Sequence, residues 1–492
     1  MMKFGYSRLA IVQSAAAALV LVVASVGLVV TDEKSQVIDD TEATAVPTGI
    51  APDALPTASA APGTKSSGTL SIPGAPGAPG GAPALVKGKV GQGVTDTEIR
   101  VGIQVPKNLN AAIQLLGAST TAADNLVQQV QAVEKWINAH GGVAGRKLRV
   151  ILHETDPLAG TFATQSQEAC THFTEDAEVI MAANTLSSVG PDMIACLAQH
   201  DTPMIAQNSY PYDQAEFDKY GKYLYQTARW EAGDWHRAYL DGLKKQDFFK
   251  GGTLGLARFD SPAHKRVAEN VIRPHLKKLG VTLKEEAVIR MAGRFTEFSG
   301  MSGEIANAVL KFNDAGVNRV IFVEEAGALL FFWLPAAENA GYYPRYGLNS
   351  QLTPALHALN HARSMQGAVG VGWSPQQDVF HAQDPGVMPG FKLCDQIIKE
   401  ARLFDPDKPR SGAYECDSIF FFKEVLDRAI DLTPDGIRAT VHKLGTSFES
   451  ALTFRTRFAP SRQWGVNSLR NFAFDNGCNC FRYTGNFYAA PD

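Results

Sequence analysis

The 492-residue sequence predicts an α/β protein with two doubly wound, Rossmann-like lobes. Three observations support this fold class: a strand–helix–strand unit at residues 99–152, continued alternation to residue 208, and a second βα series over residues 253–350. Strands that alternate with helices are typical of parallel sheets covered on both faces. Two such series, joined by segments that pass back and forth, indicate two lobes that face a cleft.

The first βαβ unit carries the clearest local signals. Alternating apolar residues predict a strand over residues 99–105. A helix follows, because apolar residues recur at helical spacing from Leu126 to Ile137, and Gly141-Gly142 supplies a left-handed end. Residues 148–152 then predict the next strand.

The same reasoning places the remaining elements in order. Further strands are expected at residues 179–184, 203–208, 253–259, 286–290, 319–323 and 346–350. Helices are expected at residues 164–173, 191–199, 234–244, 263–278, 303–315, 328–340, 387–403, 414–430 and 434–444. From Leu452 the tail is aromatic, and short strands are expected there around a turn at residues 475–477.

Composition narrows the class of protein. Hydrophobic residues make up 45% of the chain and charged residues 20%, as in water-soluble globular proteins. The net charge of -4 and the lack of a basic stripe argue against a nucleic-acid partner. The apolar run at residues 9–30, behind Lys3 and Arg8, predicts export and a membrane attachment. Residues 1–31 are thus a signal sequence or a transmembrane anchor; the lack of an Ala-x-Ala site favours the anchor.

A linker separates this segment from the lobes. Residues 32–92 are rich in Pro, Ala, Gly, Thr and Ser and bury too little apolar surface to fold, so we expect a disordered tether. The chain has no cysteine near residue 31, which excludes a lipoprotein anchor there. The protein is therefore expected outside the cytoplasm, tethered to the cell membrane or secreted.

Six cysteines in an exported chain predict disulfides. Cys170 and Cys196 lie on two helices that pack side by side in a doubly wound order, so we expect them to pair. Cys394–Cys416 is a second expected pair. Cys478 and Cys480 bond to each other or elsewhere, and buried free thiols are the alternative reading.

The run Ile137-Asn-Ala-His-Gly-Gly-Val-Ala-Gly-Arg-Lys-Leu148, followed by Glu154-Thr-Asp156, resembles the leucine/isoleucine/valine-binding proteins, which are type I periplasmic solute-binding proteins. The resemblance implies a clamshell whose chain crosses a three-segment hinge. Lobe one would be residues 97–228 plus 373–445, and lobe two residues 229–372 plus 446–492. It also implies binding of a small polar or carboxylate-bearing solute for delivery to an ABC permease.

Ligands of open α/β sheets bind beyond the carboxyl ends of the strands, which selects a set of loops. Ser187 and Ser188 precede a helix and would hold an anion at its N-terminus; Ser187 matches the carboxylate-binding serine of the family, and an ordinary helix cap is the alternative. Trp230 stacks on ligand or packs the hinge. The other candidate ligand-binding residues are Asn208, Ser209, Tyr210, Asp260, Ser261, Glu325 and Ser350.

One departure from the family bears on the ligand. Ser350 stands where amino-acid-binding members have an acidic residue that pairs with the ligand's ammonium group, although Glu324 or Glu325 could substitute. A buried ammonium without a partner costs several kcal/mol. A carboxylate, an amide or an aromatic acid therefore fits as well as a branched-chain amino acid.

Enzyme signatures are lacking: the sequence has no G-x-S-x-G elbow, no phosphate-binding Walker loop and no H-E-x-x-H motif. We expect no catalytic residue, no cofactor and no metal. His357 and His361 are four residues apart but lack a third ligand by sequence, so an exposed helix face is favoured. The alternative functions are a ligand-sensing receptor domain of the same fold and an exported α/β enzyme.

Overall fold

The computed structural model describes residues 88–108, 110–111, 125–184, 189–324, 327–379, 388–404 and 413–490. The chain divides into two units, residues 1–70 and 71–492, and all described residues belong to the second. The expected signal sequence or anchor and most of the expected linker lie outside these ranges. Within them, no helix combines the length and apolar character needed to cross a membrane.

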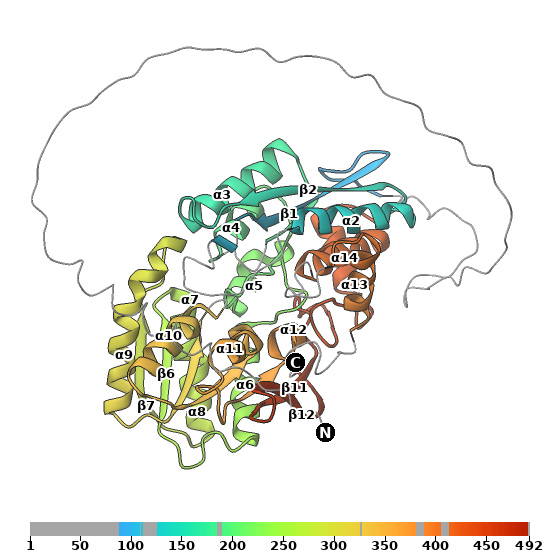
Figure 1. The fold of residues 1–492 in the computed structure, drawn as a ribbon. Helices are drawn as coiled ribbons and strands as arrows, with labels where there is room; N and C mark the ends of the chain where they lie inside the picture. Colours follow the sequence, from blue (N-terminus) through green and yellow to red (C-terminus); the bar gives the residue numbers. More distant parts are fainter. Residues whose placement is uncertain are drawn as a thin grey trace, which may run out of the picture. The chain divides into compact units, whose positions relative to one another are not determined.

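A five-stranded parallel sheet has the order β2-β1-β3-β4-β5. Its strands are β1 (Glu98–Pro106), β2 (Lys147–Thr155), β3 (Met181–Ala183), β4 (Met204–Ile205) and β5 (Leu224–Tyr225). Helices α2 (Leu126–Ala139), α13 (Pro389–Glu400), α14 (Ala413–Arg428) and α15 (Pro434–Val441) cover one face, and α3 (Phe162–Thr171) and α4 (Asp192–Gln199) cover the other (Figure 1). A chain segment near the C-terminus therefore completes the core of the first sheet.

Strand alternation explains how both faces are buried. Ile99, Val101 and Ile103 of β1 pack against α2 and α14, whereas Gly102 faces the opposite side. A Cβ atom on Gly102 would lie 2.7 Å from the ring of Phe173, so only glycine allows this close approach. The alternation at residues 99–105 thus turns the large apolar side chains toward α2 and α14, while the opposite face of the strand packs against Phe173.

A seven-stranded sheet has the order β12-β11-β10-β9-β8-β6-β7. Five of its strands are parallel to one another: β6 (Leu254–Phe259), β7 (Leu283–Ile289), β8 (Arg319–Val323), β9 (Arg345–Asn349) and β10 (Val369–Gly372). The last two are β11 (Ser468–Asp475) and β12 (Cys480–Ala489), and β11 is antiparallel to both β10 and β12. Its helices are α6 (Ala232–Lys245), α7 (Pro262–Val267), α8 (Arg273–Lys278), α9 (Ser302–Asp314), α10 (Ala328–Asn339) and α11 (Pro354–Asn360). The α/β fold with two parallel, helix-covered sheets is as predicted.

Several elements differ from the sequence-based expectation. The helix expected at residues 263–278 is α7 and α8 with a π-helical segment, Ala268–Ile272, between them. Pro274 follows that segment, and its missing N–H and bulky ring disfavour a regular α-helical ladder there. Strands β11 and β12, of 8 and 10 residues, are longer than the short strands expected in the tail. Helix α5 (Gln214–Tyr220) was not expected, because it has only 7 residues and little periodicity. Helix α11 carries His357, but this side chain is buried and does not lie on an exposed helix face as expected.

The chain is held against the first sheet's helices from residue 89 onward. The amide of Lys89 donates to Asp431 Oδ1 at 2.8 Å, and that of Gly91 donates to the carbonyl of Leu432. Gln92 Nε2 donates to Thr202 Oγ1 at 2.6 Å. Residues 88–92, which we expected to lie in the linker, are thus anchored to the folded part.

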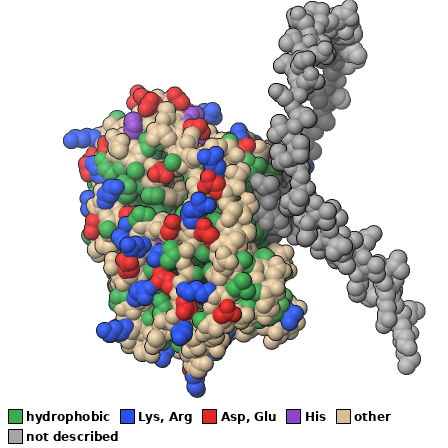
Figure 2. All heavy atoms as spheres, turned by 90° about the vertical axis from the view of Figure 1, so that its left-hand side faces the viewer, with side chains coloured by type: hydrophobic (Ala, Val, Ile, Leu, Met, Phe, Trp, Pro, Cys, Tyr) green, Lys and Arg blue, Asp and Glu red, His purple; other side chains and the backbone are tan. Residues whose placement is uncertain are grey.

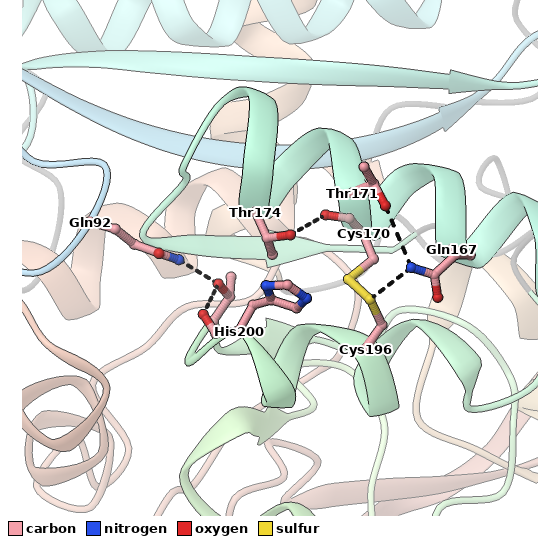
Figure 3. The surroundings of a disulfide bond; sticks show 8 residues. Gln92, Gln167, Cys170, Thr171, Thr174, Cys196 and His200 are labelled. Carbon is pink, nitrogen blue, oxygen red and sulfur yellow. Dashed lines mark hydrogen bonds between the residues drawn. A yellow bond between two sulfur atoms is a disulfide. The ribbon is translucent and has the colours of Figure 1, made fainter.

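Disulfides join neighbouring helices. Cys170 of α3 is bonded to Cys196 of α4, with Cα atoms 6.2 Å apart, and Cys394 of α13 to Cys416 of α14, with Cα atoms 5.9 Å apart. The third bond links Cys478 to Cys480 in the turn between β11 and β12. Gln167 Nε2 lies 3.5 Å from Cys196 Sγ, and Figure 3 shows Gln167 beside this disulfide. All six cysteines fall within the described ranges, and none of them is free.

The surface in Figure 2 carries basic and acidic side chains interspersed with each other. Among the described residues, ion pairs such as Arg294–Glu297 and Lys311–Glu285 join side chains of opposite sign. A protein that follows a nucleic-acid backbone needs a stripe of one sign. This face offers none.

Candidate functional site

Polar residues follow the carboxyl ends of strands in both sheets. The segment 206–212 follows β4, residues 350–352 follow β9, and Trp373-Ser374 follow β10. Residues 226–231, after β5, carry the chain from the first sheet to α6 and the second sheet. These are the positions at which α/β sheets bind ligands.

Contacts across large sequence separations bring these segments together. The ring centroids of Trp230 and Trp373 lie 5.8 Å apart, and the amide of Trp373 donates to Ser350 Oγ at 2.8 Å. The amide of Ala232 donates to the carbonyl of Tyr212 at 2.8 Å. We call this convergence of residues 208–212, 229–232, 349–351, 373–374 and 378 the crossover site.

Arg229 is the central charged residue of the crossover site. Its side chain is buried, with 3% of the residue exposed, and Nη1 donates to Gln351 Oε1. Within the described part of the chain, Nε has no hydrogen-bond partner and no carboxylate lies within ion-pair distance. Burial lowers the pKa of Arg229, and nearby Tyr414 and Asp378 act against this shift. A buried guanidinium therefore lacks a direct counter-ion.

Asp378, the last residue of the short helix α12 (Pro375–Asp378), lies near Arg229. Its Oδ2 accepts from the hydroxyl of Tyr483 at 2.7 Å and from the amide of Ser374 at 3.2 Å. Burial raises the pKa of Asp378 to about 7, and hydrogen bonds and Arg229 oppose the shift. This carboxyl group thus takes up or loses a proton near neutral pH.

Several buried N–H groups of the crossover site have no hydrogen-bond partner among the described residues. They are Arg229 Nε, Trp230 Nε1, Trp373 Nε1 and Asn349 Nδ2. A buried donor without a partner costs about 1–3 kcal/mol. Unsatisfied donors in native proteins usually meet a water, an ion or a ligand.

The predicted residues of the first sheet are held in the crossover site but are partly satisfied. Asn208 is buried; its Nδ2 donates to the carbonyl of Gly190 at 3.0 Å, and its amide donates to Asn184 Oδ1. Ser209 is buried beside it. The hydroxyl of Tyr210 donates to Glu216 Oε1 at 2.8 Å, so this group holds helix α5.

The predicted residues of the second sheet divide into two groups. Ser350 is fully buried in the crossover site and accepts hydrogen bonds from Trp373 and Ser374. Asp260 is exposed and accepts from the amide of Met291 at 2.8 Å, and Ser261 bonds to His264 Nδ1 at 2.5 Å. Asp260 and Ser261 therefore make local contacts beside α7, and no contact with the crossover site is seen for either.

Three predicted residues, Ser187, Ser188 and Glu325, lie outside the described residues. Glu324, which precedes Glu325, is buried, and its carboxylate accepts from the amides of Leu329 and Leu330, in the first turn of α10. The negative charge of Glu324 thus stabilises the N-terminus of α10.

Sequence reasoning missed Arg229 and Asp378. Arg229 was read only as part of the segment that leaves the first lobe, and Asp378 was not singled out. For Arg229 the available signal was a charged residue next to Trp230, soon after a strand. No such signal marks Asp378. A charged residue is usually exposed and is buried only where a partner is present, and the periodicity of the sequence does not distinguish the two cases.

A small hollow lies at the ends of β1 and β2. It is lined mainly by Gln104, Thr155, Phe162, Gln165 and Ser166. Gln104 Nε2 donates to Thr155 Oγ1 at 2.9 Å, and Gln104 Oε1 has no partner in the described structure. This geometry suits a water molecule or a polar ligand group.

Known structures share this fold. The chain is similar to a possible leucine/isoleucine/valine-binding protein from Rhodopirellula baltica, at 15% identity and a TM-score of 0.56, over 79% of this chain and 96% of that chain. It is also similar to an ABC transporter solute-binding protein from Rhodopseudomonas palustris in complex with 3,4-dihydroxybenzoic acid (12%, TM-score 0.57, 80% and 98%). A third is a substrate-binding protein from Desulfitobacterium hafniense in complex with Leu (13%, TM-score 0.52, 79% and 100%).

At these identities the structures establish the fold alone. No curated protein matches the chain in sequence. The family model of the periplasmic binding proteins matches residues 111–475, about three quarters of the chain. The chain therefore belongs to the periplasmic binding protein family, in its type I, leucine/isoleucine/valine-binding-protein-like form.

Proposed function

We propose that this protein binds a small polar or carboxylate-bearing solute between two lobes, outside the cytoplasm, and delivers it unaltered to an ABC importer. The lobes would be residues 97–228 plus 373–445 and residues 229–372 plus 446–492. The observation that carries the proposal is the crossover site, where buried polar groups from both sheets converge with several N–H donors unsatisfied.

Contacts between the two groups of elements support a closed clamshell. Arg266 of α7 pairs with Asp213 and Glu216, at 2.5 and 3.3 Å. The amide of Phe162, at the start of α3, donates to the carbonyl of Gly293 at 3.0 Å. Such contacts form only when the lobes are together, so they would stabilise the ligand-bound form by a population shift.

Family membership supports the importer as partner, with closure creating the surface that the permease recognises. Two of the structurally similar proteins were solved with small acids, 3,4-dihydroxybenzoic acid and leucine. A micromolar Kd requires only about -8 kcal/mol, which a few buried hydrogen bonds and one aromatic contact provide.

A binding screen tests the proposal. The full chain is tested by thermal shift against amino acids, amides, aromatic acids and short-chain acids, and each hit is measured by calorimetry. The bound solute is then recovered and analysed by mass spectrometry. We expect saturable, one-to-one binding and an unchanged solute; a chemically converted solute would support an enzyme instead, and no hit would contradict solute binding.

A further inference from the structure

We infer that Arg229 is the specificity-determining residue of the crossover site and that it selects solutes bearing a carboxylate and no ammonium group. The inference rests on the proposed function and names the class of its ligand.

An arginine is rarely buried without a partner, because the desolvation of its charge must be offset by an opposite charge. Arg229 is buried, and its one side-chain hydrogen bond among the described residues is to the neutral Gln351. Tyr414, which is also near, is a neutral phenol whose pKa burial raises further. Asp378 acts on Arg229 from beyond ion-pair distance, so the guanidinium itself is open to direct contact with a ligand carboxylate, which fits it in two-point geometry.

The surrounding unsatisfied groups favour the same ligand chemistry. Arg229 Nε, Trp230 Nε1, Trp373 Nε1 and Asn349 Nδ2 are all donors, and these donors come from three separate segments of the chain. Donors without partners are matched by an acceptor such as an oxyanion. An ammonium group, which only donates, could meet the unsatisfied oxygens Asn208 Oδ1, Ser209 Oγ and Asp378 Oδ1 but would leave all four of these N–H donors without a partner.

The buried acids near this region are largely occupied. Glu324 accepts from two amides of α10, and Glu231 accepts from the amides of Gly233 and Asp234 at 2.7 Å. Asp378 alone combines closeness to Arg229 with an oxygen, Oδ1, that has no partner in the described structure. An ammonium-bearing ligand would need that oxygen, so Asp378 is the residue that separates the two ligand classes.

The two classes make opposite predictions for Asp378. If the ligand is an acid alone, Asp378 is a nearby negative charge that opposes it, and Asp378→Asn strengthens binding by up to about tenfold. If the ligand is an amino acid whose ammonium contacts Asp378, the same substitution weakens binding, because a buried ammonium loses its partner.

Matched probes test the inference on the full chain by calorimetry. The first pair, 4-hydroxybenzoate and 4-hydroxybenzamide, differs in charge; the second, 4-methylpentanoate and leucine, differs in the ammonium group. We expect the wild-type protein to bind the acid more tightly than its matched probe, by at least about 30-fold, in one pair or the other. The comparison is 4-hydroxybenzoate with 4-hydroxybenzamide, or 4-methylpentanoate with leucine. Arg229→Gln should remove that preference, and Arg229→Lys should retain part of it.

A matched control and a stability measurement exclude a merely structural role. Arg290→Gln changes the same chemistry at a side chain that is 70% exposed and should alter neither preference nor affinity. Arg229→Gln should leave the thermal midpoint without ligand unchanged or higher, because it removes an uncompensated charge.

The outcomes are distinct. If the wild-type protein binds amide and acid, or leucine and 4-methylpentanoate, equally well, or if Arg229→Gln keeps the preference, the inference is wrong while solute binding stands. The inference also fails if Asp378→Asn weakens binding of the acid. If neither these probes nor any solute of the wider screen binds, the proposed function itself is contradicted.

Discussion

The ring of Phe162, at the first turn of α3, lies 6.0 Å from the ring of Phe298, although the two residues belong to elements of different sheets. Phe162 is buried, with 6% exposed, in the apolar cluster of the seven-stranded sheet. The amide of Phe162 also donates to Gly293. A side chain from a helix of the five-stranded sheet thus packs into the apolar core of the seven-stranded sheet.

This relationship predicts that Phe162 controls solute release. Phe162→Ala removes apolar contacts that exist only when the lobes are together, and truncation of a buried Phe costs about 3–5 kcal/mol when the site cannot collapse. We expect dissociation of the tightest solute from the screen to become at least about tenfold faster, which corresponds to 1.4 kcal/mol of that loss. Stopped-flow tryptophan fluorescence measures the rate.

The control for this change is Phe487→Ala, on β12, where the side chain is 40% exposed. That variant should release solute at the wild-type rate. Equal rates for wild type and Phe162→Ala would show that the contact does not stabilise the closed form.

Arg266 should contribute a smaller, salt-dependent share of closure. Its side chain is 36% exposed and pairs with Asp213 and Glu216, and half-exposed ion pairs are worth about 0–1 kcal/mol. Arg266→Gln should weaken solute binding by up to about fivefold at low salt. The ratio of wild-type to variant Kd should approach one near 1 M salt, because exposed charges are then screened. A ratio that is constant with salt would contradict this role.

Glu415 should make the folded state less stable as pH rises. Burial raises its pKa to about 7 from a usual value of 4.5, so between these values the folded state holds a proton that the unfolded state has lost. The free energy of unfolding therefore falls as pH rises through this window, and all of Glu415's contribution is present only below it. Glu415→Gln removes the effect and should stabilise the protein by about 3 kcal/mol at pH 8 and by little at pH 4.

Urea unfolding of wild type and variant at the two pH values measures this difference, and other titrating groups cancel between them. Glu400→Gln, at an exposed position in the last turn of α13, is the control and should show no such pH dependence. A stabilisation of Glu415→Gln that is the same at both pH values would contradict the assignment.

The disulfides should differ in their contributions to stability. Cys170–Cys196 closes a loop with a sequence separation of 26, and Cys478–Cys480 one of 2. In the loop-entropy model, replacing the first pair by alanine costs about 3 kcal/mol and replacing the last pair about 1 kcal/mol. Thermal unfolding of the two double variants compares them; an equal loss for both would show that loop length is not the determinant here.

Much of the fold could be predicted because its signals are local. Most of the strands and helices follow from alternation and helical spacing, whereas the two-residue strand β5 was not expected. The expected Cys170–Cys196 pair followed from the adjacency of two helices in a doubly wound sheet. The crossover site could be predicted only in outline. Trp230 and Ser350 follow strands in the expected order, whereas the burial of Arg229 depends on contact with Gln351, 122 residues away.

Other parts depend on tertiary contacts that no local pattern records. Phe162 reads as an ordinary apolar residue at a helix start, and only the meeting of the two sheets places it beside Phe298. The hydroxyl of Tyr210 donates to Glu216, a contact that the sequence pattern does not record, and its role in ligand binding stays a prediction. The ligand-binding roles of Ser187, Ser188 and Glu325 stay predictions.

The most direct test of solute capture is a crystal structure of the full chain with the tightest-binding solute. We predict density for the intact solute enclosed between the two sheets, with its carboxylate on Arg229 and further contacts to Trp230 and Ser350. A solute bound on an outer face, or one that leaves Arg229 without a counter-ion, would contradict the account.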